Sequence, residues 1–367
     1  MIKTIWTMSI SLLAFNALGF YEPEVAKGYT LTTYAEVPNA RQMAQSANGT
    51  LFVGSRSDGE VHAVLPNGKV RLIAEGLNMP SGLALNKTGD LYISAVNRIY
   101  RLQNAQTIVS KSKGDITLEL LTDKLPSDSH HGWKFISFDP NNGNLVVPVG
   151  APCNVCLVYP NTKQPYGTIL SLDINKLNQG QLDYTIVAQG VRNSVGFDWH
   201  PQSNQLWFTD NGRDWFGDDY PPCEINHVAK QGAHFGFPFK HADLDETDED
   251  ILAQMPKPFS YESPVIELQA HSAPLGMMFY NGPIAHLKGA LIVAEHGSWN
   301  RTKPVGYRVS AYWLKDNKVT KHEVLVNWLI RGKKLGRPVD IDMAADGSLY
   351  ISDDSADVIW QLSRTSQ

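Results

Sequence analysis

The sequence has little cysteine, no block of basic residues and, after its first residues, no long apolar run. A net charge of −5 with scattered Lys and Arg argues against a nucleic-acid partner. No later stretch approaches the roughly 18 apolar residues of a membrane helix, so no stable membrane span is expected. Segments with helical periodicity are also scarce. The many aromatic residues favour a folded protein with a large core.

The three cysteines exclude several kinds of site. Cys153 and Cys156 form a C-x-x-C motif, but Leu157 follows where covalent haem attachment needs His. A four-ligand zinc site would need more Cys or suitably spaced His, and no iron–sulfur motif is present. In an oxidising compartment a disulfide is expected. Cys153–Cys156 is the simplest pair, and a pair of either residue with Cys223 is the alternative.

Residues 1–19 are predicted to be a signal peptide. Lys3 gives a short positive region, and Ile5–Phe15 is an apolar run too short to span a bilayer. Ala17, Leu18 and Gly19 then place small residues at the two cleavage positions. An uncleaved anchor or a buried first element is the alternative. We therefore expect a periplasmic or secreted protein in which residues 20–367 form a single domain.

A pattern that recurs six times predicts the fold. Each copy has a small polar cluster, a short alternating strand, a turn with Gly or Asn, and a second apolar strand. The copies begin at Asn39, Met79, His130, Arg192, Pro274 and Gly336. Such repeats are typical of propeller blades, so we predict an all-β, six-bladed β-propeller in which Tyr29–Glu36 closes the ring. A β-sandwich or a β-helix explains the six-fold pattern less well.

The polar cluster before each inner strand should lie at one mouth of the central channel. The clusters contain Arg41 with Gln42, Ser81, His130 with His131, Arg192 with Asn193, Pro274 with Gly276, and Arg337. Loops after the second strands add Arg56, residues 210–213 and residues 296–301. Three arginines and a histidine that face one channel suit an anionic ligand.

The stretch from Gly190 to His227 is the most informative part of the chain. In a hairpin, the start of one strand and the end of its partner meet at the same edge. Arg192 and Asn193, just before the first strand, should therefore approach residues 210–214, just after the second. A cation, two amides and two carboxylates would then converge, which indicates a site for a polar ligand or a metal.

Eight motifs in the chain also carry a family resemblance. They are SHHGWKFI, VGAPCNVC, GVRNSVGFDWHP, TDNGRDWFGDD, EIN, HFGFP, AEHGSWNR and GRPVDI. Together they span roughly Asn39 to the C-terminus and resemble the soluble sugar dehydrogenases that depend on pyrroloquinoline quinone (PQQ), the glucose/sorbosone dehydrogenase family. The resemblance implies a six-bladed propeller that binds PQQ and calcium and oxidises a sugar hydroxyl. The electron acceptor is not identified by any motif.

The same resemblance implies roles for single residues. His130 matches the general base by position, with His131 as the fallback and as a cofactor contact. Arg192 matches the arginine that stabilises negative charge forming on the quinone, and Asn193 a cofactor contact. Arg337 matches an arginine that binds a PQQ carboxylate.

Two further assignments follow from the motifs. Arg301 or Lys303 is expected to take a second carboxylate of PQQ. The backbone carbonyls of Gly212 and Arg213 match the loop that ligates calcium, a cation that prefers oxygen ligands. The chain departs from the family pattern at two positions. Arg213 stands where relatives have Pro, and Cys223 stands at a position where relatives often have an acidic residue.

Each of these residues also has an ordinary structural explanation. The two histidines can be solvent-facing loop residues, Arg192 can cap a strand, and Arg301 and Arg337 can form surface ion pairs. Two other functions remain open. One is a metal-dependent lactonase-type propeller, which needs a carboxylate-rich metal site, and the other is a non-catalytic propeller that acts as a binding module.

Overall fold

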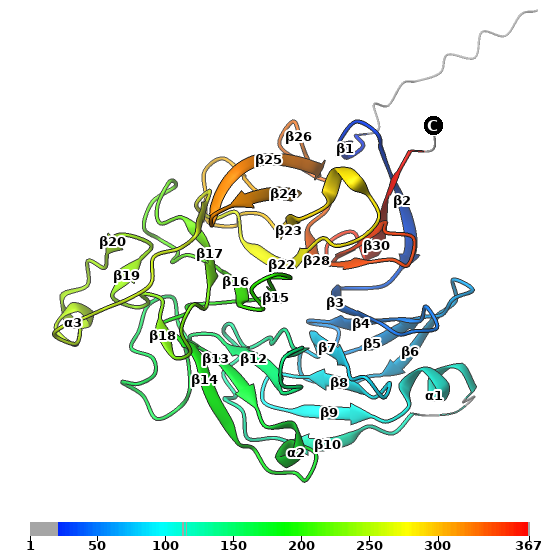
Figure 1. The fold of residues 1–367 in the computed structure, drawn as a ribbon, viewed down its shortest axis with the longest axis horizontal. Helices are drawn as coiled ribbons and strands as arrows, with labels where there is room; N and C mark the ends of the chain where they lie inside the picture. Colours follow the sequence, from blue (N-terminus) through cyan, green and yellow to red (C-terminus); the bar gives the residue numbers. More distant parts are fainter. Residues whose placement is uncertain (1–20, 112–113, 115, 366–367) are drawn as a thin grey trace, which may run out of the picture.

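The structure is a computed structural model that describes residues 21–111, 114 and 116–365. Its strands form six sheets of four or five strands around a common centre, with two small two-stranded hairpins outside them (Figure 1). This arrangement confirms the predicted all-β, six-bladed propeller. The expected signal peptide, residues 1–19, lies outside the described residues. Within those residues, no helix has the length and apolar character needed to cross a membrane.

Blades one and two are four-stranded antiparallel sheets that follow the chain in order. Blade one contains β3 (Ala40–Gln45), β4 (Leu51–Ser55), β5 (Val61–Val64) and β6 (Val70–Ala74). Blade two contains β7 (Gly82–Leu85), β8 (Leu91–Ser94), β9 (Ile99–Leu102) and β10 (Glu119–Thr122), with α1 (Ala105–Lys111) before its last strand.

Blades three and four surround the region that the sequence marks as most informative. Blade three contains β11 (Ser137–Phe138), β12 (Leu145–Val149), β13 (Thr168–Leu172), β14 (Tyr184–Gln189) and a parallel fifth strand, β18 (Ala233–His234), with α2 (Ile174–Leu177) beside it. Blade four contains β15 (Phe197–Trp199), β16 (Leu206–Asp210), β17 (Cys223–His227) and β21 (Ile266–Leu268). The hairpin β19 (Lys240–His241) and β20 (Leu244–Asp245) and the helix α3 (Glu249–Leu252) project from blade four.

The last two blades share the N-terminal segment. Blade five contains β22 (Pro274–Phe279), β23 (Ala290–Glu295), β24 (Arg308–Lys315), β25 (Lys318–Asn327) and β1 (Glu24–Val25), with η1 (Ala285–Leu287). Blade six contains β28 (Pro338–Met343), β29 (Leu349–Asp353), β30 (Val358–Arg364) and β2 (Tyr29–Glu36), and the hairpin β26 (Leu329–Ile330) and β27 (Lys333–Lys334) precedes it. Because β2 pairs antiparallel with β30, the predicted ring closure is confirmed.

The core lies between neighbouring blades rather than inside any one of them. Phe52 of blade one packs with Leu91 and Ile93 of blade two, and all three are fully buried. Trp328, also fully buried, belongs to the cluster that joins blades five and six. Burial of apolar surface, worth about 25 cal/mol per Å², at these interfaces stabilises the ring.

Polar side chains of the inner strands join successive blades. Gln42 accepts the backbone N–H groups of Leu83 and Ile136, each at 2.9 Å, and so joins blade one to blades two and three. Asp198 accepts the N–H of Phe279 at 2.7 Å between blades four and five. Because its amide is used in this way, Gln42 does not line the large cavity at the channel mouth, where the sequence placed it.

Asp340 makes the same kind of bond across the closing interface, from blade six to the N–H of Met43 at 2.8 Å. Burial raises the pKa of this carboxyl to about 7. Because the folded-state pKa lies above the ordinary value of 3.8, its contribution to stability is complete below about pH 4 and is lost as the pH rises through about 7.

Replacing Asp340 by Asn keeps an acceptor for Met43 and removes the ionisation. At pH 4 we expect D340N to melt close to wild type. At pH 8.5 we expect it to be more stable than wild type by on the order of 2–4 kcal/mol. Thermal unfolding at the two pH values measures this, with D123N at an exposed carboxyl as the control. An equal loss of stability at both pH values would contradict the expectation.

Candidate functional site

The loops before the inner strands and after the second strands meet around a cavity of about 570 Å³. All six blades contribute to it, so it occupies one mouth of the central channel. The basic and acidic residues that line it are four arginines, four histidines and one aspartate: Arg41, Arg56, Arg192, Arg337, His130, His131, His271, His296 and Asp214. An excess of cations over carboxylates suits a negatively charged ligand.

Arg192 lines this cavity with 3% of its surface exposed. Its Nη2 pairs with Asp214 Oδ2 at 3.0 Å, and its Nη1 donates to the carbonyl of Asn211 at 3.0 Å. The carboxylate of Asp210, at the end of β16, accepts the backbone N–H groups of Arg192 and Asn193 at 2.8 and 2.6 Å. The structure therefore brings together the two segments that the hairpin argument placed at one edge.

Asn193 also lines the cavity, and none of its side-chain atoms has a hydrogen-bond partner among the described residues. Its amide is thus available to a ligand. Gly150 must stay small here, because a Cβ at that position would lie 2.6 Å from the Cβ of His131 and 3.3 Å from Asn193 Oδ1.

The two neighbouring histidines occupy different environments. His130 is exposed toward the cavity, and its ring lies 4.1 Å from that of His131. Burial and then the charge of Arg192 lower the pKa of His130 below its ordinary value of 6.5, so it is neutral at pH 7. His131 is buried, its Nδ1 lies 2.8 Å from the carbonyl oxygen of Ala151, and burial holds its pKa well below the ordinary value. Beneath them, buried Lys134 donates to the carbonyl of Gly132 at 2.8 Å and fixes this loop.

The opposite side of the cavity carries a second charged group. Asp354 bonds His296 Nε2 and Arg41 Nη1, each at 2.8 Å. Burial alone would raise the pKa of Asp354, but His296 and Arg41 together lower it, so the carboxylate is charged. The charge of Arg41 is therefore matched within the protein.

Two other arginines of the cavity have no such partner. Within the described residues, neither Arg56 nor Arg337 forms an ion pair. Arg56 stacks on Trp133 with its Cζ 4.2 Å from the ring centre, and burial followed by the charge of Arg41 lowers its pKa. Arg337 donates from Nη2 to the carbonyl of Gly297 at 2.9 Å. These two guanidinium groups keep donors and charge for a ligand.

Gly212 lines the cavity, while the side chain of Arg213 turns away from it. The guanidinium of Arg213 pairs with the buried carboxylate of Glu246 and stacks on Phe216. Within the described residues, no hydrogen bond reaches the backbone carbonyl of either Gly212 or Arg213. The protein therefore uses neither oxygen as a hydrogen-bond acceptor, and the loop is tight, since a Cβ on Gly212 would lie 2.7 Å from the carbonyl oxygen of Pro222.

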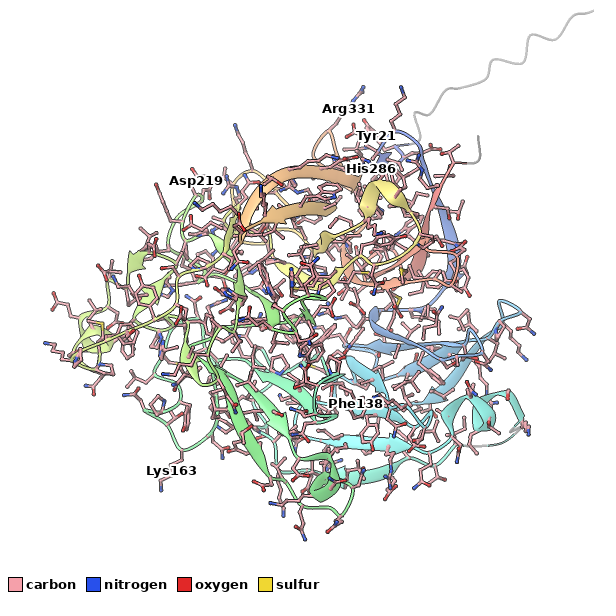
Figure 2. All side chains as sticks on the ribbon, in the orientation of Figure 1. Tyr21, Phe138, Lys163, Asp219, His286 and Arg331 are labelled. Carbon is pink, nitrogen blue, oxygen red and sulfur yellow. A yellow bond between two sulfur atoms is a disulfide. The ribbon has the colours of Figure 1, made fainter. Side chains whose placement is uncertain are left out.

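Arg301 and Lys303 are not among the residues that line the cavity. Arg301 bonds the carbonyl oxygen of Asp218 and pairs with Asp219 at 2.7 Å, and Figure 2 places Asp219 toward the outer edge of the molecule. This is the surface ion pair that the sequence left open as the alternative. The bond joins two rim loops, whose exposed Trp215 and Trp299 lie edge to face with ring centres 5.5 Å apart.

The cysteines follow the simplest expected pairing. Cys153 and Cys156 form a disulfide, and Cys223 is a free, buried thiol at the cavity wall. Two residues that hold the side chains of the site, Asn154 and Asp354, are not among those predicted from the sequence. Asn154 lies inside the motif VGAPCNVC, and Asp354 directly follows the second strand of the sixth repeat, as Asn211 does in the fourth. That positional equivalence was the signal that would have found Asp354.

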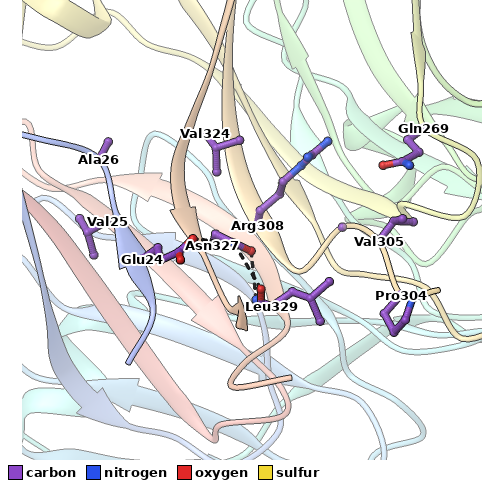
Figure 3. Close-up of a pocket in the computed structure, with 11 residues that line it drawn as sticks. Glu24, Val25, Ala26, Gln269, Pro304, Val305, Arg308, Val324, Asn327 and Leu329 are labelled. Carbon is purple, nitrogen blue, oxygen red and sulfur yellow. Dashed lines mark hydrogen bonds between the residues drawn. The ribbon is translucent and has the colours of Figure 1, made fainter. Parts of the chain in front are cut away.

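A second cavity, of about 480 Å³, lies at the outer edge of blade five (Figure 3). Its polar groups are used to hold the N-terminal segment, because Asn327 bonds Glu24 at 3.1 Å and the backbone of Leu329 at 3.0 Å. Arg308, which also lines it, is paired with Glu295 at 2.9 Å. The cavity at the channel mouth, with its unpaired cations, is the better candidate for a functional site.

A sequence profile of the family described as TrAA12-like matches residues 23–227 and 220–365, and the chain belongs to this family. An uncharacterized protein of Borreliella burgdorferi is 36% identical over 342 residues, which cover 89% of this chain and 86% of that protein. The resemblance to PQQ-dependent sugar dehydrogenases that the motifs carry is thereby confirmed at the level of the family.

Solved structures share the fold. A calcium structure of the Trichoderma reesei Carbohydrate-Active Enzymes Family AA12 protein superimposes with a TM-score of 0.76 at 20% identity, over 94% of this chain and 97% of that one. The holo form of the PQQ domain of pyranose dehydrogenase from Coprinopsis cinerea has a TM-score of 0.74 at 18% identity, over 94% and 97% of the two chains.

Proposed function

We propose that this protein is a PQQ- and calcium-dependent dehydrogenase that oxidises a hydroxyl group of a small sugar. The observation that carries the proposal is the cavity of about 570 Å³ at the channel mouth, where four arginines and four histidines face one aspartate. Support also comes from the family and from its structural relatives, a calcium structure of an AA12 protein and the PQQ domain of a pyranose dehydrogenase.

The donor set fits a quinone that carries several carboxylates. Arg56 and Arg337 bring unpaired charge, and the free amide of Asn193 adds a neutral donor. Guanidinium groups bind carboxylates through two parallel N–H bonds, which gives orientation as well as affinity. We propose Arg337 and Asn193 as cofactor contacts, with Arg56 in the place that the sequence gave to Arg301 or Lys303.

When bound, PQQ supplies the acceptor for the hydride that leaves the sugar carbon. The chain has to take the hydroxyl proton, and we propose His130 for this step. Its ring is neutral at pH 7 and faces the cavity. His131 is the neighbouring cofactor contact, oriented by the Ala151 carbonyl.

Arg192 is proposed to stabilise the negative charge that develops on the ligand. It is buried, and within the described residues one of its five N–H groups, on Nη1, is not used by the protein. A donor that is already fixed costs no reorganisation when charge develops. Trp299, beside Trp215 at the rim, offers a flat apolar surface for a sugar ring.

The free carbonyls of Gly212 and Arg213 are proposed to hold calcium. Gly212 and Asp214 both line the cavity proposed for the quinone. We also propose that the protein is periplasmic or secreted, because the Cys153–Cys156 disulfide needs an oxidising compartment to persist.

Two tests decide between this function and its alternatives. The apo protein is titrated with PQQ, with and without calcium, and dye reduction is then followed with a panel of aldoses. We expect saturable PQQ binding that a chelator weakens, and sugar-dependent dye reduction. Absence of PQQ binding would overturn the proposal, and lactone hydrolysis without PQQ would favour a lactonase.

Arg337 gives a residue-level prediction for the same titration. Replacing it by Ala removes a charged donor without breaking an ion pair, so PQQ affinity should fall by about ten- to a hundredfold. R98A is the matched control, because Arg98 is exposed on blade two and, within the described residues, its side chain bonds only Tyr100. Equal affinities of R337A and R98A would contradict the assignment.

A further inference from the structure

The orientation of Arg192 depends on Asn154, which lies between the two disulfide-bonded cysteines in the loop after β12. The backbone carbonyl of Asn154 accepts from Nε of Arg192 at 2.9 Å, and its Oδ1 accepts from Nη2 at 2.8 Å. The same Oδ1 accepts the N–H of Asp214 at 2.8 Å, and its Nδ2 donates to the carbonyl of Asp214 at 2.9 Å. Asn154 thus bonds both the guanidinium of Arg192 and the backbone of Asp214, which pairs with that guanidinium.

Only an asparagine amide satisfies the three contacts of this side chain, since the fourth is made by the backbone carbonyl. Its oxygen faces two donors and its nitrogen faces an acceptor, so the amide has one satisfied orientation. An aspartate at position 154 would place an oxygen against the carbonyl of Asp214. An alanine would leave Nη2 of Arg192 and the N–H of Asp214 each without this acceptor.

Asn154 helps to determine which N–H group of Arg192 is available to a ligand in the cavity. Of the five N–H groups of Arg192, two go to Asn154, one to Asp214 and one to the carbonyl of Asn211. Because the guanidinium is planar and rigid, fixing four of these groups fixes the direction of the fifth. The fifth, on Nη1, is the one left for a ligand.

The disulfide constrains the same loop. It closes a short ring, with a Cα–Cα distance of 6.1 Å, around Asn154 and Val155. Val155 packs on the small buried cluster of Ala151 and Phe237, and the N–H of Ala151 bonds the backbone carbonyl of Arg192 at 2.8 Å. A cross-link here reduces the conformations open to Asn154, and therefore the entropy lost when its backbone and side chain bind Arg192 together.

We propose that Asn154 is a positioning residue for Arg192, and that the Cys153–Cys156 disulfide holds it in place. The affinity of the cavity for an anionic quinone then depends on the redox state of this cysteine pair. The inference rests on the proposed function, in which Arg192 contacts the quinone, but the orientation of Arg192 is measurable without any cofactor.

Three variants test it: N154A, the double variant C153S/C156S, and N161A as the control, since Asn161 is exposed in the same loop and does not contact Arg192. The first readout is the ¹⁵N NMR signal of the Arg192 Nε–H in the apo protein, assigned by its absence from R192K. We expect a slowly exchanging, shifted signal in wild type and N161A. In the other two variants it should move toward the position of exposed arginines and exchange at least about tenfold faster.

The second readout is the dissociation constant for PQQ with calcium present. We expect an increase of about ten- to a hundredfold for N154A and about tenfold for C153S/C156S. In an R192A background the N154A change should have no further effect, because Asn154 acts only through Arg192.

Reduction of wild type tests the disulfide directly. A dithiol reductant delivers two electrons and two protons to the cystine and is itself oxidised to a cyclic disulfide. Treated wild type should reach the PQQ affinity of C153S/C156S, and the double variant should not respond.

The outcomes separate the two proposals. An unchanged Arg192 signal and unchanged PQQ affinity in N154A would overturn the positioning role, as would full additivity of N154A with R192A. If wild type binds no PQQ while the Arg192 signal still moves in N154A, the proposed function fails and the positioning role stands. If N154A does not fold, C153S/C156S and reduced wild type decide the question through the same two readouts.

Discussion

Replacing Arg192 by Ala is expected to lower kcat/KM for the sugar by about a thousandfold or more. The guanidinium is buried and fixed by four hydrogen bonds, so it acts as a donor that is already in place when charge develops. Its removal also leaves Asp214 without its partner in a partly buried site, which should cost about 3 kcal/mol or more of folding stability.

R192K separates these two effects. Lysine keeps the positive charge beside Asp214 but cannot reach Asn154, Asp214 and Asn211 together. We expect its melting temperature to lie near that of wild type while kcat/KM stays at least about tenfold lower. Steady-state dye reduction and thermal unfolding of the three proteins measure this. If kcat/KM of either variant equals that of wild type, Arg192 does not take part in the mechanism.

Replacing His130 by Gln is the second large effect expected. Loss of the base should lower kcat by about a hundred- to ten-thousandfold, while the dissociation constant for PQQ changes by about twofold or less. H131Q is the matched comparison, because His131 is buried and bonded to a backbone carbonyl. If H131Q loses kcat and H130Q does not, His131 is the base.

The pH dependence supplies an independent check on His130. Burial and then the charge of Arg192 lower its pKa, so the neutral, proton-accepting form persists below pH 6.5. When kcat/KM is plotted against pH, its fall on the acid side should therefore have a midpoint below pH 6.5. The residual activity of H130Q should not show this fall. A midpoint above 7 would exclude His130 as the base.

The blades were predictable from the sequence because each one is encoded locally. Alternation along Val195–Trp199 and Leu206–Thr209 predicts a hairpin, and six such patterns predict a ring that Tyr29–Glu36 closes. Polar residues at a fixed place in each repeat must then gather at one mouth. This is why Arg192, His130 and Arg337 line one cavity although they are distant in sequence.

The partners of these residues were not predictable in the same way. Asn154 is 38 residues from Arg192, and their contact depends on the path of a loop that has no periodic signal. Arg301 was expected at the cavity, but Asp218 and Asp219, on the neighbouring loop, hold it at the rim. Gln42 is used between blades because buried backbone N–H groups there need an acceptor. Each of these outcomes depends on tertiary contacts that a single repeat does not encode.

The most direct test of the central claim is a crystal structure of the protein soaked with PQQ and calcium. We expect quinone density in the cavity at the channel mouth, with its carboxylates at Arg56 and Arg337, and with Arg192 and His130 facing the ring. A calcium ion should lie against the carbonyls of Gly212 and Arg213. Quinone bound elsewhere, or a cavity that stays free of it at saturating PQQ, would contradict the account.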